Sequence, residues 1–199
     1  LQSSMTLTIR KGVPTDAASA VPLILSAAYE LLVSIFGDED EEKTRAFLHH
    51  AWCKAQGQYG CQNHWVAVKD NNVVGVVTAW HTKLGSAFDR ATLDSITTFY
   101  SLDESMLVLM RNQAVSVGLV PPTPHELMLG HIAVDTAHRK SGVGRFMIAH
   151  MITHARTLKK QTIVLDVQLS NIPAIRFYQR LNFSELAVNS GFVRFSLNV

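Results

Sequence analysis

Runs of apolar and β-branched residues along the chain predict its strands. Two such runs, 64–69 and 73–81, flank an Asp-Asn-Asn stretch at 70–72, so they are expected to form a hairpin. Further strands are expected at 7–12, 126–134 and 162–168, and a last hairpin at 184–188 and 192–197.

Helical periodicity fills the intervals between these strands. Pro14, Thr15 and Asp16 form a helix-start signal, and the helical pattern behind them runs to about Phe36. The acidic stretch GDEDEE at 37–42 stands where a second helix begins, where it complements the helix dipole or attracts a cationic substrate. Further helices are expected at 142–158 and 172–181, with helical patches around 88–100 and 103–117.

The order of these elements predicts an α/β fold. The C-terminal half alternates strand, helix and strand, an arrangement typical of a sheet with helices packed on it. The 199 residues suffice for one domain with a full core, which we expect to span 5–199. The four residues LQSS ahead of Met5 are expected to be a cloning remnant.

Composition excludes several classes of partner. The net charge is +2 and no long Lys/Arg run stands out, so we expect no nucleic-acid partner. The apolar runs are broken well before the ~18 residues that a membrane span needs, and no signal-peptide pattern opens the chain. Two cysteines are too few for a disulfide framework, and the expected location is cytoplasmic.

One cluster of residues has the chemistry of zinc ligands. The stretch around 49–64 holds His49, His50, Cys53, Cys61 and His64, and Cys-x2-His is a workable half-site. The first three fall at a predicted helix end, however, and the gap between the two cysteines is unusual for a zinc site. We therefore expect a chance cluster and no metal.

A basic glycine turn stands between a predicted strand and a helix, in the stretch HIAVDTAHRKSGVGRFMIAHM at 131–151. A helix N-terminus offers unpaired N–H groups and a partial positive charge, and glycine lets an anion approach the backbone closely. The turn is no Walker A loop, because Gly144 is followed by Arg145, and no Rossmann fingerprint, because Met147 stands at the third glycine. The pattern that remains is R-x-x-G-x-G, beginning at Arg139.

This turn and its surroundings resemble the GNAT superfamily of N-acetyltransferases. Their core carries Q/R-x-x-G-x-G/A between the fourth strand and the third helix, where backbone amides hold the pyrophosphate of acetyl-CoA. Downstream, LDVQLSNIPAIRFYQRLNF at 165–183 matches the family's L-x-V-x-x-x-N-x-x-A-x-x-F-Y-x-x-x-x-F, and LTIRKGVPTDA at 7–17 looks like its first strand and helix entry. The resemblance implies a mixed, mostly antiparallel central sheet of about six to seven strands flanked by helices.

The resemblance also implies the residues that hold acetyl-CoA. The family's fourth strand, here "IAV", pairs its backbone with the pantetheine arm, and Asn171 lies beside the same arm besides being an N-cap candidate. Lys140 and Ser141 replace residues common in the family, and Lys140 needs a backbone conformation that a non-glycine residue tolerates. The expected binding residues are Ile132, Ala133, Val134, Arg139, Lys140, Ser141, Gly142, Val143, Gly144, Arg145, Asn171 and Tyr178.

Acetyl transfer to an amine requires loss of an amine proton, stabilisation of an oxyanion and protonation of the departing thiolate. By resemblance, the backbone amide of Val134 stabilises the oxyanion, because the family's fourth strand bulges there and splays from the fifth. Tyr178 is the expected general acid and doubles as a contact of the co-substrate, whereas Phe177 is expected to be a core aromatic.

The general base is less well marked. Some family members place Glu or His at the strand positions held here by Met128 and Gly130, neither of which accepts a proton. Glu126 lies on the same strand face by the period of two, and is our tentative base. His131 lies on the other face unless a bulge turns it; His81, His125 and a water relay are further candidates.

These features predict an acetyl-CoA-dependent N-acetyltransferase acting on a primary amine of a small molecule, peptide or protein. The alternative is an acyl-CoA-binding sensor or structural domain with weak or no catalysis, favoured only by the missing base. The segment 83–125 is the main part without a match to the family, and we expect it to form a wall or lid on the acceptor side. Its apolar residues, MLVLM at 106–110 with Phe99 and Tyr100, leave plain packing or a homodimer contact open.

Overall fold

The computed structural model describes residues 6–199, in which one mixed sheet runs through the molecule. The LQSS stretch and Met5 lie outside the described residues. The sheet has seven strands in the order β1-β2-β3-β4-β5-β7-β6. Only β4 and β5 are parallel neighbours among them, and all other pairs are antiparallel. The expected α/β fold with a mostly antiparallel sheet is therefore confirmed. The strands are β1 (Leu7–Lys11), β2 (His64–Lys69), β3 (Asn72–Trp80), β4 (Glu126–Val134), β5 (Thr162–Gln168), β6 (Ser184–Asn189) and β7 (Phe192–Asn198).

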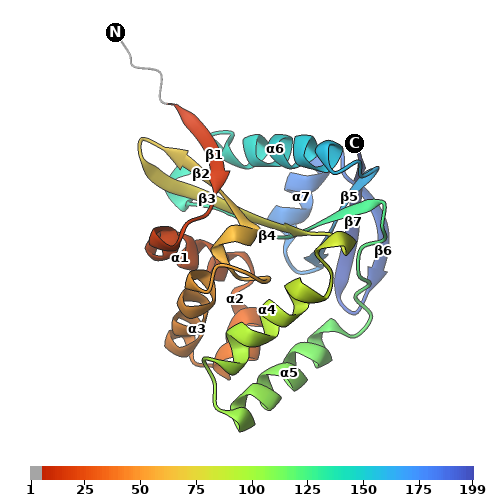
Figure 1. Ribbon diagram of the computed structural model, residues 1–199. Helices are drawn as coiled ribbons and strands as arrows, with labels where there is room; N and C mark the ends of the chain where they lie inside the picture. The colour runs from red at the N-terminus through yellow and green to blue at the C-terminus, as the bar shows by residue number, and fades with distance from the viewer. Residues whose placement is uncertain (1–5) are drawn as a thin grey trace.

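Helices cover both faces of the sheet (Figure 1). The helices that precede β4 lie on one side, and the two that follow it lie on the other. Short 3-10 turns at Pro14–Asp16, Cys61–Asn63, Thr82–Leu84 and Thr136–His138 link several of these elements. The helices are α1 (Ala17–Ala27), α2 (Tyr29–Leu32) with a π-helical continuation at Val33–Gly37, α3 (Glu41–Cys53), α4 (Gly85–Thr97), α5 (Leu102–Ser116), α6 (Val143–Thr157) and α7 (Ile172–Arg180).

Each helical layer has its own apolar core. On the α1–α3 side, Trp52, Phe47 and Ile24 are fully buried against one face of the sheet. On the α6 side, Met147 and Met151 are fully buried against the other face. Removing this apolar surface from water is the main favourable contribution to folding, at roughly 25 cal/mol per Å².

The first predicted helix is wrong in one respect. The pattern predicts a helix from Pro14 to about Phe36, but Ala28 leaves helical geometry at φ −152° and ψ 55°, and the chain bends there by 102°. No glycine or proline marks the break, so it is imposed by packing: the bend turns Ile35 and Phe36 into the core beside α3. No single helix in residues 6–199 is long and apolar enough to span a membrane, although this bent pair passes by length and composition alone.

Two local expectations are confirmed. In the first hairpin, Asp70 and Asn71 have φ of 51° and 63°, the left-handed geometry that a tight hairpin turn requires. In the acidic stretch, the Asp40 carboxylate accepts from the backbone N–H of Lys43 at 3.2 Å and so caps α3.

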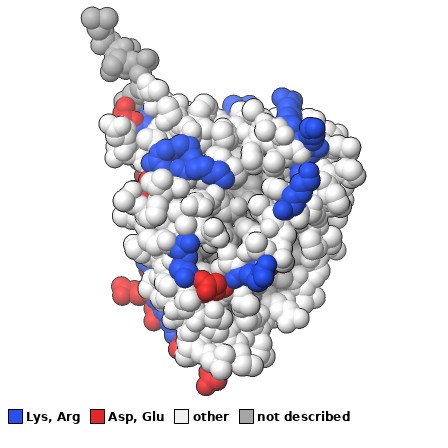
Figure 2. All heavy atoms as spheres, in the orientation of Figure 1, with Lys and Arg blue, Asp and Glu red and all other residues white. Residues whose placement is uncertain are grey.

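Charged side chains are distributed unevenly over the face drawn in Figure 2. Lys and Arg side chains lie in small groups over the upper and middle parts around a shallow hollow, and acidic side chains gather toward the lower left.

The cysteines of the stretch around 49–64, which has the residue types of a zinc site, lie in different surroundings: Cys61 is buried and Cys53 is exposed. Within the described part of the chain, no three His, Cys, Asp or Glu side chains come together as a metal site.

Candidate active site

A gap opens in the middle of the sheet between β4 and β5. The two strands pair only from Glu126 to Leu129, opposite Thr162 to Leu165, although β4 continues to Val134. At the same point β4 carries an extra residue: Val77 pairs with Ile132, but Ala79 pairs with Leu129. This bulge bends β4 away from β5, and both strands leave backbone groups unpaired along the gap.

The register of β4 determines which of its amides face the gap. The backbone N–H of Asp135 donates to Val74 on β3 at 2.8 Å. Because successive residues of a strand point their amides to opposite sides, Val134 and Ile132 direct theirs away from β3 and toward the gap. Ala133, which pairs with Val76, directs its amide back to β3. The predicted oxyanion donor, Val134, therefore has the required orientation, and Ile132 shares it.

The glycine turn behind β4 is a cluster of unsatisfied donors. Helix α6 starts after Gly142, whose φ is 87°, and the first helical bond runs from Phe146 N–H to the Gly142 carbonyl at 2.9 Å. Within residues 6–199, no group accepts from the backbone N–H groups of 140–145. Such a run of free amides at the start of a 15-residue helix favours a phosphate-bearing ligand.

The side chains of the turn leave this cradle open. A Cβ added to Gly142 would meet nothing within 4 Å, whereas one at Gly144 would lie 3.0 Å from the Phe177 ring. Gly144 therefore lets α6 approach α7, and Gly142 supplies the left-handed turn. Lys140 also has a positive φ of 64°, in the left-handed region that non-glycine residues adopt only rarely, so its conformation is less readily tolerated than expected. Arg139 directs its guanidinium to the Val134 carbonyl at 3.4 Å.

Tyr178 lies where the gap meets α7. Its ring is 5% exposed and packs edge-on against Phe177 and Phe183, with ring centroids 5.2 and 5.4 Å apart. Tyr178 lines a cleft that opens from the gap. Burial raises the pKa of Tyr178, so the phenol stays protonated at neutral pH and can donate. Phe177 packs against the core, as predicted.

Asn171 fixes the start of α7. Its side chain accepts from the backbone N–H of Ala174 at 3.3 Å, which confirms the predicted N-cap. Both residues also line the cleft. The cap therefore holds the beginning of α7 at the edge of the gap, with Tyr178 further along the same helix.

The bulge in β4 brings two histidines together. His131, turned to the α1–α3 side, lies with its Nε2 2.7 Å from Nε2 of His64, whose Nδ1 lies 2.6 Å from the Gly60 carbonyl. A carbonyl only accepts, so His64 carries its proton on Nδ1, and its bare Nε2 accepts from His131. The lone pair on His131 Nδ1 is then not used in the contact between the two rings, and His131 lines the cleft.

Burial keeps both rings neutral. It lowers the pKa of His64 to about 4. Burial, and then the coulombic repulsion that two protonated rings would have at this distance, lower the pKa of His131 well below its ordinary value. Tyr59 stacks on the His131 ring at 6.0 Å with an interplanar angle of 8° and restricts its orientation.

The other candidate bases lie in less suitable places. Glu126 sits at the start of β4, where its carboxylate accepts from Thr123 N–H at 2.8 Å, and it is not among the described residues that line the cleft. His81 lines the cleft, but its Nδ1 is buried without a partner, and burial lowers its pKa. His125 is exposed outside the cleft.

The cleft occupies about 660 Å³ between the gap and the helices of the α1–α3 side. Residues of the segment 83–125, among them Phe88, Val115 and Leu119, form one of its walls. Phe99 and Tyr100 instead pack in the core, where the Tyr100 hydroxyl donates to the Phe36 carbonyl at 2.5 Å. These two aromatics therefore anchor the segment rather than face the cleft.

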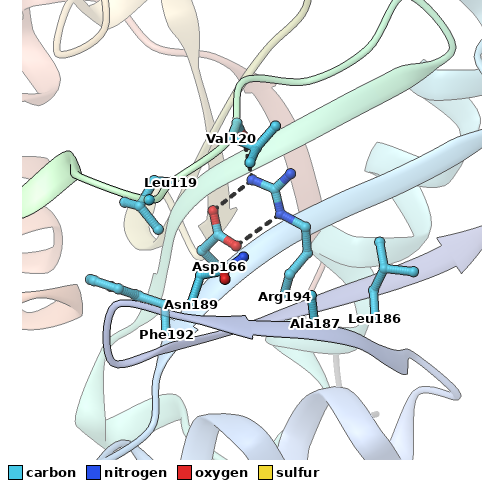
Figure 3. Close-up of a pocket in the computed structure, with 9 residues that line it drawn as sticks. Leu119, Val120, Asp166, Leu186, Ala187, Asn189, Phe192 and Arg194 are labelled. Atoms are coloured by element: carbon cyan, nitrogen blue, oxygen red, sulfur yellow. Dashed lines mark hydrogen bonds and ion pairs between the residues drawn. The ribbon is translucent and has the colours of Figure 1, made fainter.

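An ion pair anchors the end of the same segment (Figure 3). Arg194 on β7 binds Asp166 on β5 through two hydrogen bonds of 2.9 and 2.8 Å, and its Nη2 donates to the Val120 carbonyl at 2.5 Å. The Asp166 hydrogen bond, followed by the smaller coulombic attraction, raises the pKa of Arg194 against the opposing effect of burial. Nothing in the local sequence marks this pair or the histidine pair, because each joins elements far apart in the chain.

Comparison with proteins of known structure and function agrees with this geometry. The sequence model of the acetyltransferase (GNAT) family matches residues 25–183 of this chain. The ribosomal protein bS18 alanine N-acetyltransferase of Salmonella typhimurium is 34% identical over 67 residues, which are 34% of this chain and 45% of that protein. The Escherichia coli K12 protein of the same name is 33% identical over the same share. The chain thus spans about half the length of the curated relatives that it matches.

Solved structures share the fold over nearly the whole chain. An acetyltransferase crystal structure superposes with a TM-score of 0.71 at 21% identity, covering 96% of this chain and 99% of that one. An N-acetyltransferase from Staphylococcus aureus Mu50 gives 0.69 at 15% identity, covering 96% and 100%. The PaiA N-acetyltransferase from Thermoplasma acidophilum, solved with coenzyme A, gives 0.58 at 10% identity, covering 98% and 100%. With its strand gap, glycine turn and family match over most of its length, this chain belongs to the GNAT acetyltransferase family.

Proposed function

We propose that this chain transfers the acetyl group of acetyl-CoA directly to a primary amine. The observation that carries the proposal is a run of free backbone amides at 140–145 beside the gap between β4 and β5. The protonated Tyr178 lines the cleft that opens from this gap. The family uses acetyl-CoA, and the curated relatives are named as N-acetyltransferases, which supports the same reaction. Their bacterial ribosomal target also supports a cytoplasmic location and keeps a peptide or protein amine among the acceptors.

The residues of the turn suit the co-substrate. The pyrophosphate would lie on the amides of 140–145, with the exposed cations Arg139 and Arg145 beside it. The open space at Gly142 leaves room for the phosphates to approach the backbone. The outward C=O group of Ile132 would pair with an amide of the pantetheine arm, as in an added strand at a free sheet edge, and the outward N–H groups of β4 stay available for the acyl oxygen.

The reaction needs one bond formed and one broken. The amine nitrogen attacks the thioester carbonyl carbon, the carbon–sulfur bond breaks, one proton leaves the nitrogen and one reaches the sulfur. The outward N–H groups of β4 stabilise the negative charge that develops on the carbonyl oxygen. Val134 is the predicted donor, and Ile132, which lines the cleft, shares its direction. Tyr178 gives its phenolic proton to the departing thiolate.

For the base, we propose His131 rather than Glu126. Its Nδ1 lone pair is free to take the amine proton, while its Nε2–H stays bound to His64. His64 in turn is held through Nδ1 by the Gly60 carbonyl, so the pair keeps one tautomer and one ring orientation. A neutral imidazole with a fixed free nitrogen is the state that a general base requires at neutral pH.

Calorimetric titration with coenzyme A tests the binding half of this proposal. Gly142→Asp places a carboxylate against the phosphates and strains the left-handed turn, so coenzyme A affinity should fall at least about 100-fold. Gly191→Asp is the matched control, because Gly191 has φ 81° and open space like Gly142 but lies in the β6–β7 turn. Equal affinities in the two folded variants would contradict the assignment of the turn.

A further inference from the structure

We infer that the amine acceptor is a small molecule with an aromatic or branched aliphatic body and no acidic group. The inference rests on the proposed acetyl transfer and concerns the part of the cleft that faces away from β5. We call this part the acceptor end; Leu31, Ile35, Tyr59, Trp80, Phe88 and Val115 line it.

The described residues of the acceptor end offer no cationic partner for an acid. In the described part of the chain, no lysine or arginine side chain lines the cleft. Its two carboxylates are Asp89 and Asp166, and Asp166 is already neutralised by its two bonds to Arg194. A carboxylate or phosphate on the acceptor would therefore be buried without a cation, which is strongly unfavourable.

The remaining charge favours an incoming ammonium group. Asp89 is exposed at the α4 side of the cleft, and no cation pairs with it among residues 6–199. A single carboxylate beside a cleft without lysine or arginine attracts a cationic ligand and does not require a second positive charge on that ligand. The amine would enter past Asp89 and meet the free nitrogen of His131 further in.

The shape and chemistry of the walls fit a compact apolar body. Trp80 comes from the end of β3, Tyr59 from the loop after α3, and Phe88 from α4. Leu31 and Ile35 come from the bent α2 region. These aromatic and aliphatic side chains offer an apolar body a surface to pack on, as in most small-molecule sites, although the whole cleft of about 660 Å³ also has polar side chains in its lining. The bend at Ala28, which local sequence did not predict, is what brings Leu31 to this wall.

The same wall is poorly suited to an extended peptide. Helices α4 and α5 lie side by side next to the α2 and α3 region (Figure 1), so helical side chains, not a free strand edge, close the acceptor end. A peptide laid along Phe88, Val115 and Leu119 would find no strand edge for its backbone N–H and C=O groups, and on α5 only the side chains of Asn112 and Ser116 offer polar partners. An acceptor with its polarity concentrated in one amine avoids this cost.

A matched pair of amines tests the inference by release of free thiol from acetyl-CoA. 2-Phenylethylamine and phenylalanine differ only in the carboxylate, so kcat/KM should be at least about 100-fold higher for the first. An alanine-initiated hexapeptide and spermidine complete the panel, and both should be poorer acceptors than 2-phenylethylamine. Phenylalanine or the peptide used as well as 2-phenylethylamine would overturn the inference and leave the acetyl transfer standing.

Two variants test whether the amine binds at the acceptor end. Phe88→Ala should raise the KM for 2-phenylethylamine about tenfold and leave the KM for acetyl-CoA unchanged. Leu102→Ala is the control, because Leu102 lies on α5 outside the cleft and is 77% exposed. An unchanged amine KM in Phe88→Ala would overturn the assignment of the acceptor end. No thiol release with any amine, together with no binding of acetyl-CoA, would overturn both this inference and the proposed function.

Discussion

The buried histidine pair predicts a loss of stability in mild acid. His64 is fully buried, bonded through Nδ1 to the Gly60 carbonyl and through Nε2 to His131, so its neutral form is the folded form. In the unfolded chain a histidine has a pKa of about 6.5. Its pKa in the folded protein is about 4, mainly because burial disfavours the charged ring.

The sign and size of the effect follow from these two values. Between pH 6.5 and pH 4 the unfolded state binds a proton that the folded state does not, so stability falls as the pH is lowered. Above pH 6.5 the contribution of His64 is fully present. From a folded pKa of about 4 and an unfolded pKa of about 6.5, lowering the pH from 7.5 to 5.0 costs about 2 kcal/mol from His64 alone. The pKa of His131 is lowered as well, so it acts in the same direction.

Urea unfolding at pH 7.5 and 5.0 measures this dependence. In His64→Phe, which keeps an aromatic ring but removes the titration, the difference between the two pH values should shrink by about 2 kcal/mol. Trp52→Phe, a change in a buried neighbour whose ring centroid lies 4.9 Å from that of His64, should lower stability equally at both pH values. If His64→Phe keeps the wild-type pH dependence, the neutral, hydrogen-bonded pair is refuted, and with it the tautomer on which the role of His131 rests.

Three further predictions concern single residues. Tyr178→Phe keeps the packed ring and removes the hydroxyl, so kcat should fall about 10²–10⁴-fold while coenzyme A binding stays within about threefold; a smaller loss of kcat would assign the proton to water. Lys140→Gly relieves a side chain held at φ 64°, so the free energy of unfolding should rise by about 0.5–1 kcal/mol; a decrease would show that this turn is unstrained. Gly130→Ala would place a Cβ 2.5 Å from the Trp80 ring and 2.6 Å from Thr78, so stability should fall by about 1–3 kcal/mol; tolerance of alanine would mean that the bulge adapts freely.

Much of the fold was predictable because its signals are local. The first hairpin follows from β-branched runs around Asp70 and Asn71, whose positive φ angles the structure confirms. The glycine turn after β4 is marked by its own residues, and Gly142 has the left-handed geometry that glycine favours. In both cases the residue types that define the conformation stand next to each other in the chain.

The bend and the bulge were not predictable from such signals. The break at Ala28 has no helix-breaking residue and depends on contacts that the following turn makes with α3. A period of two places His131 on the wrong face of β4, and only the bulge opposite β3 turns it toward His64, 67 residues earlier in the chain. The expected segment from 83 to 125 does line the cleft, but whether it moves as a lid stays a prediction.

The most direct test of the central claim is whether the acetyl group itself moves from acetyl-CoA to an amine. The purified protein is mixed with acetyl-CoA and 2-phenylethylamine, or an alanine-initiated hexapeptide, and the products are identified by mass spectrometry while free thiol is measured in parallel. The account predicts one acetylated amine for each thiol released, at a rate that Tyr178→Phe lowers about 10²–10⁴-fold. Binding of acetyl-CoA with no acetylated product from either amine would contradict it and favour an acyl-CoA-binding domain without catalysis.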